Sequence, residues 1–207
     1  RIDTQRLIES YREFLLKTNQ YKEVAFDYES LVEDSQGLRY HDICAERIVF
    51  TEGFGIHKNP YFKHLPLEGT KGELITIHAP ALQLESILKS SIFVIPMGAD
   101  QYLVGSTYEW TDKTNQPTAE AKSELLEKLE RLVSCDYEVV DQRAGIRPTV
   151  VDRRPLVGQH SDHKRLFVLN GLGTRGVLVA PSMAEALYNS IENDTPLPEE
   201  IDINRFA

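Results

Sequence analysis

The chain has 207 residues, enough for one large domain or two small ones, and its 41% hydrophobic and 27% charged residues are the composition of a folded globular protein. The 23 Lys and Arg residues against 32 Asp and Glu residues give a formal net charge of -9, which disfavours general binding to nucleic acid or to an anionic membrane surface. The two cysteines, Cys44 and Cys135, lie far apart, which excludes a disulfide framework and a cysteine-rich zinc site and fits a reducing, cytoplasmic setting.

The first residues predict that the chain is a piece of a longer protein. It begins at Arg1 without an initiator Met or a signal-peptide core, and it enters a predicted helix almost at once. No apolar run approaches the ~18–20 residues that a membrane-spanning helix needs, so we expect no membrane partner.

An amphipathic helix is predicted over residues 4–18, with Asp3 or Thr4 capping its first turn. Its apolar residues recur at helical spacing, and we expect them to pack on a sheet: they are Leu7, Ile8, Tyr11, Phe14 and Leu15. Alternating polar and apolar residues then predict a strand over 23–28, and a β-rich run predicts another over 47–51, before the glycine turn at 52–55.

The middle of the chain predicts several strands and one helix. Strands are expected at 73–78, 91–96 and 102–108, the last two forming an antiparallel hairpin. Thr118 is predicted to cap a helix whose apolar stripe runs from Leu125 to Val133.

The last third predicts a strand over 137–143, a sharp turn over 144–148, and a strand over 165–170. A glycine-rich turn at 171–176 and a helix over 177–191 follow. Strands and helices are interleaved along the whole chain, which predicts an α/β body.

The segment from Gly171 to Gly176 fits G-x-G-x-x-G between a strand and a helix, the local context of a dinucleotide-binding fingerprint. The residues after Gly176 are too few and too polar for the second parallel strand and the acidic residue of that fold. Two interpretations stay open. The helix N-terminus could face an electron-rich group such as the pyrimidine edge of a flavin, or the glycines could form a tight turn without a ligand.

Five stretches stand together in chain order. Residues 48–53 end a strand in a glycine turn, 71–74 read K-G-E-L, and 102–107 contain V-G-S-T. Residues 144–148 read A-G-I-R-P and are followed by Asp152, Pro155 and Gly158. The fifth stretch, residues 171–181, starts with the glycine motif and ends at Pro181. In combination these stretches resemble the D-amino-acid-oxidase-like family of FAD-dependent amine oxidoreductases, which includes glycine oxidase and sarcosine oxidase.

The resemblance implies an α/β (α+β) fold, with a mixed, largely antiparallel substrate-binding sheet, flanking helices and the C-terminal parts of an FAD-binding domain. It implies a C-terminal portion that lacks the family's N-terminal dinucleotide-binding motif. Residues 1–65 would be part of the FAD-binding domain, 66–145 the substrate-binding domain, and 146–207 the return to the FAD-binding domain. Because the absent motif would hold the FAD diphosphate, we expect the isolated chain to be inactive.

The implied reaction is oxidation of the C–N bond of a small amino acid or secondary-amine acid by hydride transfer to FAD. Arg147 would be the catalytic and substrate-binding residue, because its guanidinium can hold a carboxylate with two parallel bonds. Phe93 would lie beside the substrate, although a core position is an equal alternative. The flavin would contact Gly53, Gly171, Gly173, Thr174, Arg175 and Gly176.

Other clusters predict less. His57 with His64, and the histidines at 160 and 163, lack a third fixed ligand, so no metal site is predicted. Arg153 and Arg154 could form a second anion site, but pairing with Asp152 or exposure to solvent is the expectation.

Two alternative functions stay open. The C-terminal segment also resembles the FAD domain of the bifunctional enzymes that mature 5-methylaminomethyl-2-thiouridine, which implies an oxidase acting on carboxymethylaminomethyluridine in tRNA. The acidic composition makes a nucleic-acid partner unexpected, and a basic surface leading to Arg147 would favour it. The other alternative is a non-catalytic binding domain, in which Arg147 would be enclosed in salt bridges with no cavity beside it.

Overall fold

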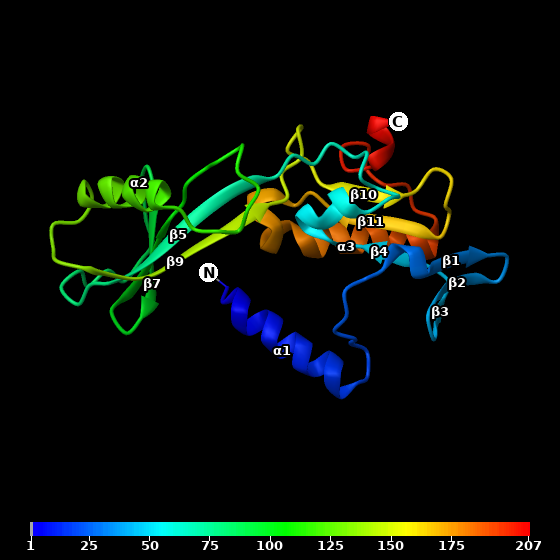
Figure 1. The fold of residues 1–207 in the computed structure, drawn as a ribbon, viewed down its shortest axis with the longest axis horizontal. Helices are drawn as coiled ribbons and strands as arrows, with labels where there is room; N and C mark the ends of the chain where they lie inside the picture. The colour runs from blue at the N-terminus through cyan, green and yellow to red at the C-terminus, as the bar shows by residue number, and fades with distance from the viewer. Residues whose placement is uncertain (1) are drawn as a thin grey trace.

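A computed structural model describes residues 2–207 as two lobes connected by two long strands (Figure 1). Arg1, where the first predicted domain starts, lies outside the described residues. One lobe holds a five-stranded antiparallel sheet in the order β6-β7-β8-β5-β9, with helix α2 on one face. Its elements are β5 (Thr70–His78), β6 (Leu88–Lys89), β7 (Phe93–Gly98), β8 (Gln101–Gly105), α2 (Ala119–Glu130) and β9 (Glu138–Arg147).

The core of this lobe forms because one face of each strand is apolar. Ile75 and Ile77 of β5 pack with Val94 and Val104 of the sheet, and the α2 side chains that join them are Leu125 and Leu129; all of these side chains are fully buried. Each such side chain stabilises the fold by roughly 1.5–3 kcal/mol relative to exposure. Thr118 caps α2 as predicted, since its Oγ1 accepts a hydrogen bond from the Ala121 N–H at 3.2 Å.

The second lobe holds a smaller mixed sheet in the order β10-β11-β4. β11 runs parallel to β4 and antiparallel to β10, and α3 packs on the sheet through Leu187. The elements are β4 (Ile48–Phe50), β10 (Leu156–Gln159), β11 (Leu166–Asn170) and α3 (Gly176–Asn193), with short 3-10 helices η2 (Gly53–Lys58), η3 (Gly173–Arg175) and η4 (Ile203–Phe206). The predicted fold class, mixed and largely antiparallel with flanking helices, is confirmed.

Helix α1 (Thr4–Lys17) forms as predicted, with Asp3 accepting a hydrogen bond from the Arg6 N–H at 3.1 Å. The expectation that it packs on a sheet is wrong, because none of its residues is buried and it stands apart from both lobes in Figure 1. Its apolar face is exposed at Leu7, Ile8 and Phe14. Within residues 2–207, no helix has both the length and the apolar character needed to cross a membrane.

The segment 23–28 is not a strand. Phe26 is instead held by its ring, which stacks on Tyr40 with centroids 4.4 Å apart. Tyr40 belongs to a small antiparallel sheet that the sequence did not predict, made of β1 (Leu31–Asp34), β2 (Gly37–Tyr40) and β3 (Ile43–Ala45), after the short helix η1 (Tyr28–Ser30). β10 was likewise not predicted.

The predicted turn at residues 144–148 is wrong in its first part. β9 continues to Arg147, and Gly145 lies directly opposite Gly72 of β5. A glycine followed by a proline three residues later indicates a turn locally, but pairing with the nine-residue β5 keeps this segment extended.

Candidate functional site

Two glycine turns meet at one edge of the small sheet. β4 and β11 are parallel, with Phe50 opposite Val168, so the turns that follow them leave the sheet at the same end. The buried Asn170 joins these turns, because its Nδ2 donates to the Gly53 carbonyl at 2.9 Å and its Oδ1 accepts from the Gly171 N–H at 2.8 Å. The carboxyl edge of parallel strands is where open α/β sheets bind their ligands.

The glycines at this edge leave room for a flat group. Gly53 and Gly173 have φ values of +57° and +58°, and a Cβ at either position would meet nothing within 4 Å. Gly171, at φ +68°, has another role, since a Cβ there would lie 2.5 Å from the Val150 side chain. Helix α3 starts beside them, and no side chain caps its N-terminus, so its first N–H groups are left for another acceptor.

A cavity of about 410 Å³ adjoins this edge. On one side it is lined by residues 171–175, which include four of the predicted flavin residues, Gly171, Gly173, Thr174 and Arg175. The other lining side chains come from the large sheet and its loops: Thr70, Tyr108, Trp110, Thr149, Val150 and Arg153. Gly176 and Gly53 lie next to these turns rather than in the cavity wall.

Arg147 is the last residue of β9 and lies half-buried at the margin of this cavity. Its Nη1 donates to the Thr107 carbonyl at 3.4 Å, and its Cζ lies 4.8 Å from the centroid of the Tyr108 ring, which lines the cavity. No carboxylate of residues 2–207 forms an ion pair with Arg147. Burial lowers the pKa of Arg147, but a guanidinium stays protonated at neutral pH. The cation is therefore available to an acid from outside the chain.

Gly72 makes the position of Arg147 possible. The guanidinium lies over Gly72, and a Cβ at this glycine would be 1.8 Å from Arg147 Nη2. Thr70 is paired with Arg147 in the sheet, so Gly72 is the next residue of β5 on the same face. The glycine of K-G-E-L is thus required by the arginine of A-G-I-R-P.

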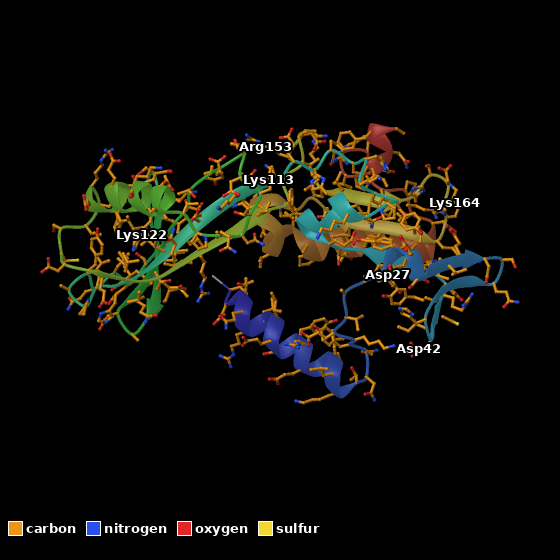
Figure 2. All side chains as sticks on the ribbon, viewed as in Figure 1. Asp27, Asp42, Lys113, Lys122, Arg153 and Lys164 are labelled. Atoms are coloured by element: carbon orange, nitrogen blue, oxygen red, sulfur yellow. The ribbon has the colours of Figure 1, made fainter. Side chains whose placement is uncertain are left out.

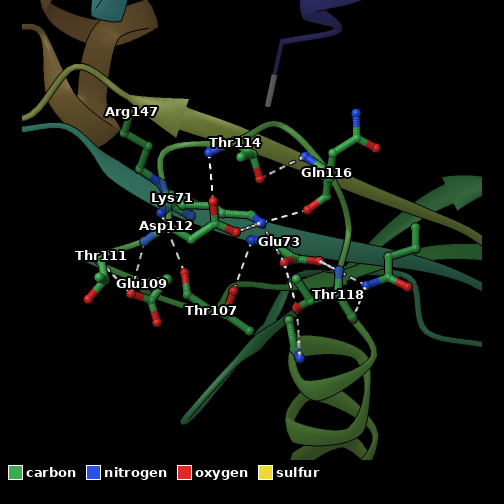
Figure 3. Close-up of polar contacts among 12 residues, drawn as sticks. Lys71, Glu73, Thr107, Glu109, Thr111, Asp112, Thr114, Gln116, Thr118 and Arg147 are labelled. Atoms are coloured by element: carbon green, nitrogen blue, oxygen red, sulfur yellow. Dashed lines mark hydrogen bonds and ion pairs between the residues drawn. The ribbon is translucent and has the colours of Figure 1, made fainter.

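On the opposite face of β5, Lys71 and Glu73 form a buried polar network (Figure 3). They are only 1% and 2% exposed. Lys71 Nζ donates to Asp112 Oδ2 and to the Gln116 carbonyl, both at 2.5 Å, and lies 3.4 Å from Glu73 Oε1. Glu73 also accepts from the Thr118 N–H and hydroxyl at 2.9 Å and from Gln142 Nε2 at 2.8 Å.

This network anchors the loop of residues 106–118 between β8 and α2. The loop carries Tyr108 and Trp110 into the cavity wall. One face of β5 therefore makes room for Arg147, and the other face anchors the loop that carries these two rings. Sequence reasoning did not identify Lys71, Glu73 or Asp112 as site-forming residues. The available signal was a lysine and a glutamate inside an otherwise buried strand, where charges need partners.

The charges in this network stabilise one another. Burial alone would raise the pKa of Glu73, but hydrogen bonds from Thr118 and Gln142 and the ammonium of Lys71 lower it below its ordinary value. Burial alone would lower the pKa of Lys71, but Asp112 and Glu73 raise it. The hydrogen bond from Lys71, with one from Thr114, lowers the pKa of Asp112 to about 2.

Replacing Lys71 with Met is expected to reduce the free energy of unfolding by about 3 kcal/mol, because it leaves the buried Glu73 carboxylate without its ammonium partner. Urea unfolding of the variant and the parent measures this change. Lys63→Met, at an exposed lysine, is the control and should stay within about 0.5 kcal/mol of the parent. Equal losses in both variants would contradict the anchoring role of the network.

Acid is expected to weaken the anchor of the loop. The folded pKa of Asp112 lies below its unfolded value, so its contribution is complete above about pH 4 and is lost as pH falls towards about 2. Unfolding free energies measured from about pH 5 to about pH 2.5 should therefore fall less steeply in Asp112→Asn than in the parent. Identical slopes would show that this ion pair does not contribute.

The remaining predicted residues lie elsewhere. Phe93, at the start of β7, shares a sheet face with Gly105 and Leu74, and its ring is 3.2 Å from the position of a Gly105 Cβ. It is not among the residues that line the cavity. Asp152 does not form an ion pair with Arg153 or Arg154 but pairs with Arg205, whose Nε is 2.8 Å from its Oδ2. Within residues 2–207, no cluster of His, Cys, Asp or Glu is arranged as a metal site.

Comparison with known proteins agrees with this geometry. The chain is 33% identical over 155 residues to the tRNA 5-methylaminomethyl-2-thiouridine biosynthesis bifunctional protein of Thiobacillus denitrificans, covering 68% of this chain and 24% of that protein. It is 25% identical over 144 residues to the glycine oxidase of Bacillus licheniformis, covering 66% of this chain and 39% of the enzyme. The chain thus spans less than half the length of these relatives.

Solved structures share the fold. The glycine oxidase of Geobacillus kaustophilus aligns with a TM-score of 0.67 at 24% identity, covering 82% of this chain and 46% of the enzyme. The iminodiacetate oxidase of a Chelativorans species aligns with a TM-score of 0.68 at 22% identity, covering 83% of this chain and 51% of that enzyme. The family model named DAO, FAD dependent oxidoreductase, matches residues 19–189. The match covers most of the chain, and the protein therefore belongs to the DAO family of FAD-dependent oxidoreductases.

Proposed function

We propose that this chain is the substrate-binding portion of an FAD-dependent enzyme that oxidises the C–N bond of an amino acid or secondary-amine acid. The observation that carries the proposal is Arg147, a half-buried cation without a carboxylate partner among residues 2–207, beside a cavity formed by the glycine turns. A guanidinium in that position can hold a carboxylate with two parallel N–H···O bonds and so fix the orientation of the substrate.

The FAD-binding domain comprises residues 1–65 and 146–207 in this proposal, and the substrate-binding domain comprises residues 66–145. The separation of the large sheet, within residues 70–147, from the sheet that joins residues 48–50 to 156–170 supports this division. The exposed apolar face of α1 suits a further part of the FAD-binding domain. Since that part would hold the FAD diphosphate, the isolated chain should bind FAD weakly and be inactive.

The residues at the sheet edge fit a flavin ring. Open space at Gly53 and Gly173 allows a flat group to approach the backbone, and the uncapped start of α3 at Gly176 offers N–H donors to an electron-rich edge. Thr174 and Arg175 would lie along the same ring. Bound FAD would supply the acceptor for the hydride of the carbon that bears the amine; the substrate nitrogen would lose its N–H proton to water, and water would hydrolyse the resulting imine.

The chain itself supplies positioning. Arg147 orients the carboxylate, and Tyr108 covers part of the guanidinium and limits its contact with water. The 106–118 loop holds Tyr108 in place through the network around Lys71. No side chain needs to act as an acid or base in this scheme, since the proton leaves from the substrate nitrogen to water.

The test is anaerobic reduction of the full-length, FAD-containing protein. Glycine, sarcosine and D-alanine are added separately, and the flavin absorbance is followed. Bleaching by at least one of them is the expected result. A protein that binds no FAD, or a bound flavin that no amine acid reduces, contradicts the proposal.

A second candidate is oxidation of carboxymethylaminomethyluridine in tRNA. The exposed aromatic rings of Tyr108 and Trp110 and the cation of Arg153 favour it, because bases stack on aromatic rings and phosphates bind arginine. The lack of an ion pair to Arg147 within residues 2–207 and the cavity beside it count against the alternative of a non-catalytic binding domain. A small amine acid is the preferred substrate because the chain as a whole carries a net charge of -9. The cytoplasmic setting stays a prediction.

A further inference from the structure

The cavity differs in charge from the rest of the chain. Acidic residues outnumber basic ones by 32 to 23, yet no Asp or Glu lines the cavity. Arg153 and Arg175 line it, and Arg147 contacts the ring of Tyr108, which also lines it. A concave site with cations of one sign concentrates anions from solution.

Arg153 is the cation that the proposed reaction does not use. It lies on the connection between β9 and β10, at the outer edge of the molecule (Figure 2), whereas Arg175 belongs to the turn assigned to the flavin. Its side chain is exposed and makes no ion pair with residues 2–207. The carboxylate next to it in sequence, Asp152, is occupied by Arg205 at 2.8 Å. The charge of Arg153 is therefore not neutralised by its neighbours.

The backbone holds Arg153 in an unusual position. Its φ is +59°, in the left-handed region that long side chains rarely adopt, and its N–H donates to the Val150 carbonyl at 2.9 Å. Arg153 is in the cavity wall, while its neighbour Arg154 is not. Residues kept in such conformations are concentrated at ligand sites.

Two aromatic side chains also line the cavity. Tyr108 and Trp110 are 63% and 49% exposed although they are large and apolar. Lys113 Nζ fixes the backbone of this wall by donating to the Trp110 carbonyl at 2.6 Å and to the Gly69 carbonyl at 2.8 Å. Tyr108 lies beside the guanidinium of Arg147, and an aromatic ring beside a cation displaces water and strengthens the attraction of that cation for an anion.

We propose that Arg153 forms a second anion subsite, so that the substrate is an amine bearing two acidic groups, one held by Arg147 and the other by Arg153. This inference rests on the proposed amine oxidation. Two sources supply a second anion: the further carboxylate of a small amine diacid, or the phosphate of a nucleotide. Both would bind the guanidinium through charge-assisted hydrogen bonds.

The experiment uses the full-length, FAD-containing protein and two matched pairs of substrates. Sarcosine and iminodiacetate differ by one carboxylate on the same secondary amine, and 5-carboxymethylaminomethyluridine differs from its 5′-monophosphate by one phosphate. Arg153→Gln is expected to raise KM for the doubly acidic member of one pair by about 10- to 100-fold. KM for the singly acidic member should change by less than about 2-fold, and the pair that responds identifies the source of the anion.

Arg154→Gln is the matched control, since it removes the adjacent arginine outside the cavity wall, and it should leave both members of each pair unchanged. A second measurement does not depend on turnover. Two thioethers that cannot undergo amine oxidation, thiodiacetate and (methylthio)acetate, are titrated by calorimetry. If a small diacid supplies the second anion, Arg153→Gln should weaken only the binding of thiodiacetate.

The outcomes separate this inference from the function on which it rests. If sarcosine reduces the flavin but Arg153→Gln affects both members of each pair equally, the second subsite is wrong and the proposed oxidation stands. A loss of bound FAD as the sole effect of Arg153→Gln also overturns the subsite, because Arg153 would then serve the cofactor. If neither these four compounds nor glycine nor D-alanine reduces the flavin, the proposed oxidation itself is contradicted, whereas reduction by glycine or D-alanine alone overturns only the second subsite.

Discussion

Arg147→Ala in the full-length protein is expected to lower kcat/KM for the amine acid by about 10²- to 10³-fold, the value of two charge-assisted hydrogen bonds to a carboxylate. Steady-state kinetics with the best substrate from the flavin-reduction assay measure this loss. Unfolding should change little, because the side chain of Arg147 donates one long hydrogen bond, at 3.4 Å, and forms no ion pair with residues 2–207. The effect therefore belongs to binding and orientation rather than to folding.

Two further variants define the role of Arg147. Arg147→Lys should recover only part of the activity, because an ammonium cannot form the two parallel bonds of a guanidinium. Arg143→Ala is the control, since Arg143 lies in the same strand but is exposed and bound to Asp141 at 2.6 Å. A loss in Arg143→Ala as large as in Arg147→Ala would show that a general change of charge on β9, and not a bound carboxylate, causes the effect.

Gly72→Ala is expected to lower kcat/KM by about 10²-fold, although it changes no group that touches the substrate. The new Cβ would lie 1.8 Å from Arg147 Nη2, so the guanidinium must move, and a displacement of about 1 Å in a positioning group costs on that order in rate. The obstruction is the end of a flexible side chain, which can shift without disturbing the sheet. Thermal and urea unfolding should therefore stay within about 1 kcal/mol of the parent.

Gly145→Ala is the matched control for Gly72→Ala. The two glycines face each other across β5 and β9, but a Cβ at Gly145 would meet nothing within 4 Å. Activity in Gly145→Ala should stay within about 2-fold of the parent. If Gly72→Ala were as active as Gly145→Ala, the placement of Arg147 over Gly72 would not matter for the reaction.

Local patterns were sufficient for the regular elements with strong periodicity or a clear cap. The helix capped by Asp3, the helix capped by Thr118 and the hairpin of β7 and β8 all follow from residue spacing and turn chemistry. The segment at 23–28 shows the limit of this approach. Its alternation matches a strand, but the stacking of Phe26 on Tyr40 is a tertiary contact that local sequence does not encode.

Sequence reasoning identified some residues of the candidate site and missed others. Motif resemblance pointed to Arg147 and to the turn at 171–176 before any geometry was known, and these residues lie at one cavity or at its margin. Asn170, Lys71 and Glu73 were missed, because their importance depends on partners from distant parts of the chain. Of the two alternatives predicted for Arg153 and Arg154, exposure to solvent is the one observed, because Asp152 pairs with a residue remote in sequence, Arg205.

The sequence by itself determined the class of fold, the family and the choice of Arg147 as the candidate for binding a substrate carboxylate, because these depend on composition, periodicity and short motifs. Only the tertiary structure decided that Gly72 makes room for Arg147, that Lys71 anchors the loop carrying Tyr108, and that Arg153 enters the cavity wall. The physical reason is the antiparallel register of β5 and β9 and the paths of the loops beside them. These bring together side chains whose separation along the chain carries no information about their distance in space.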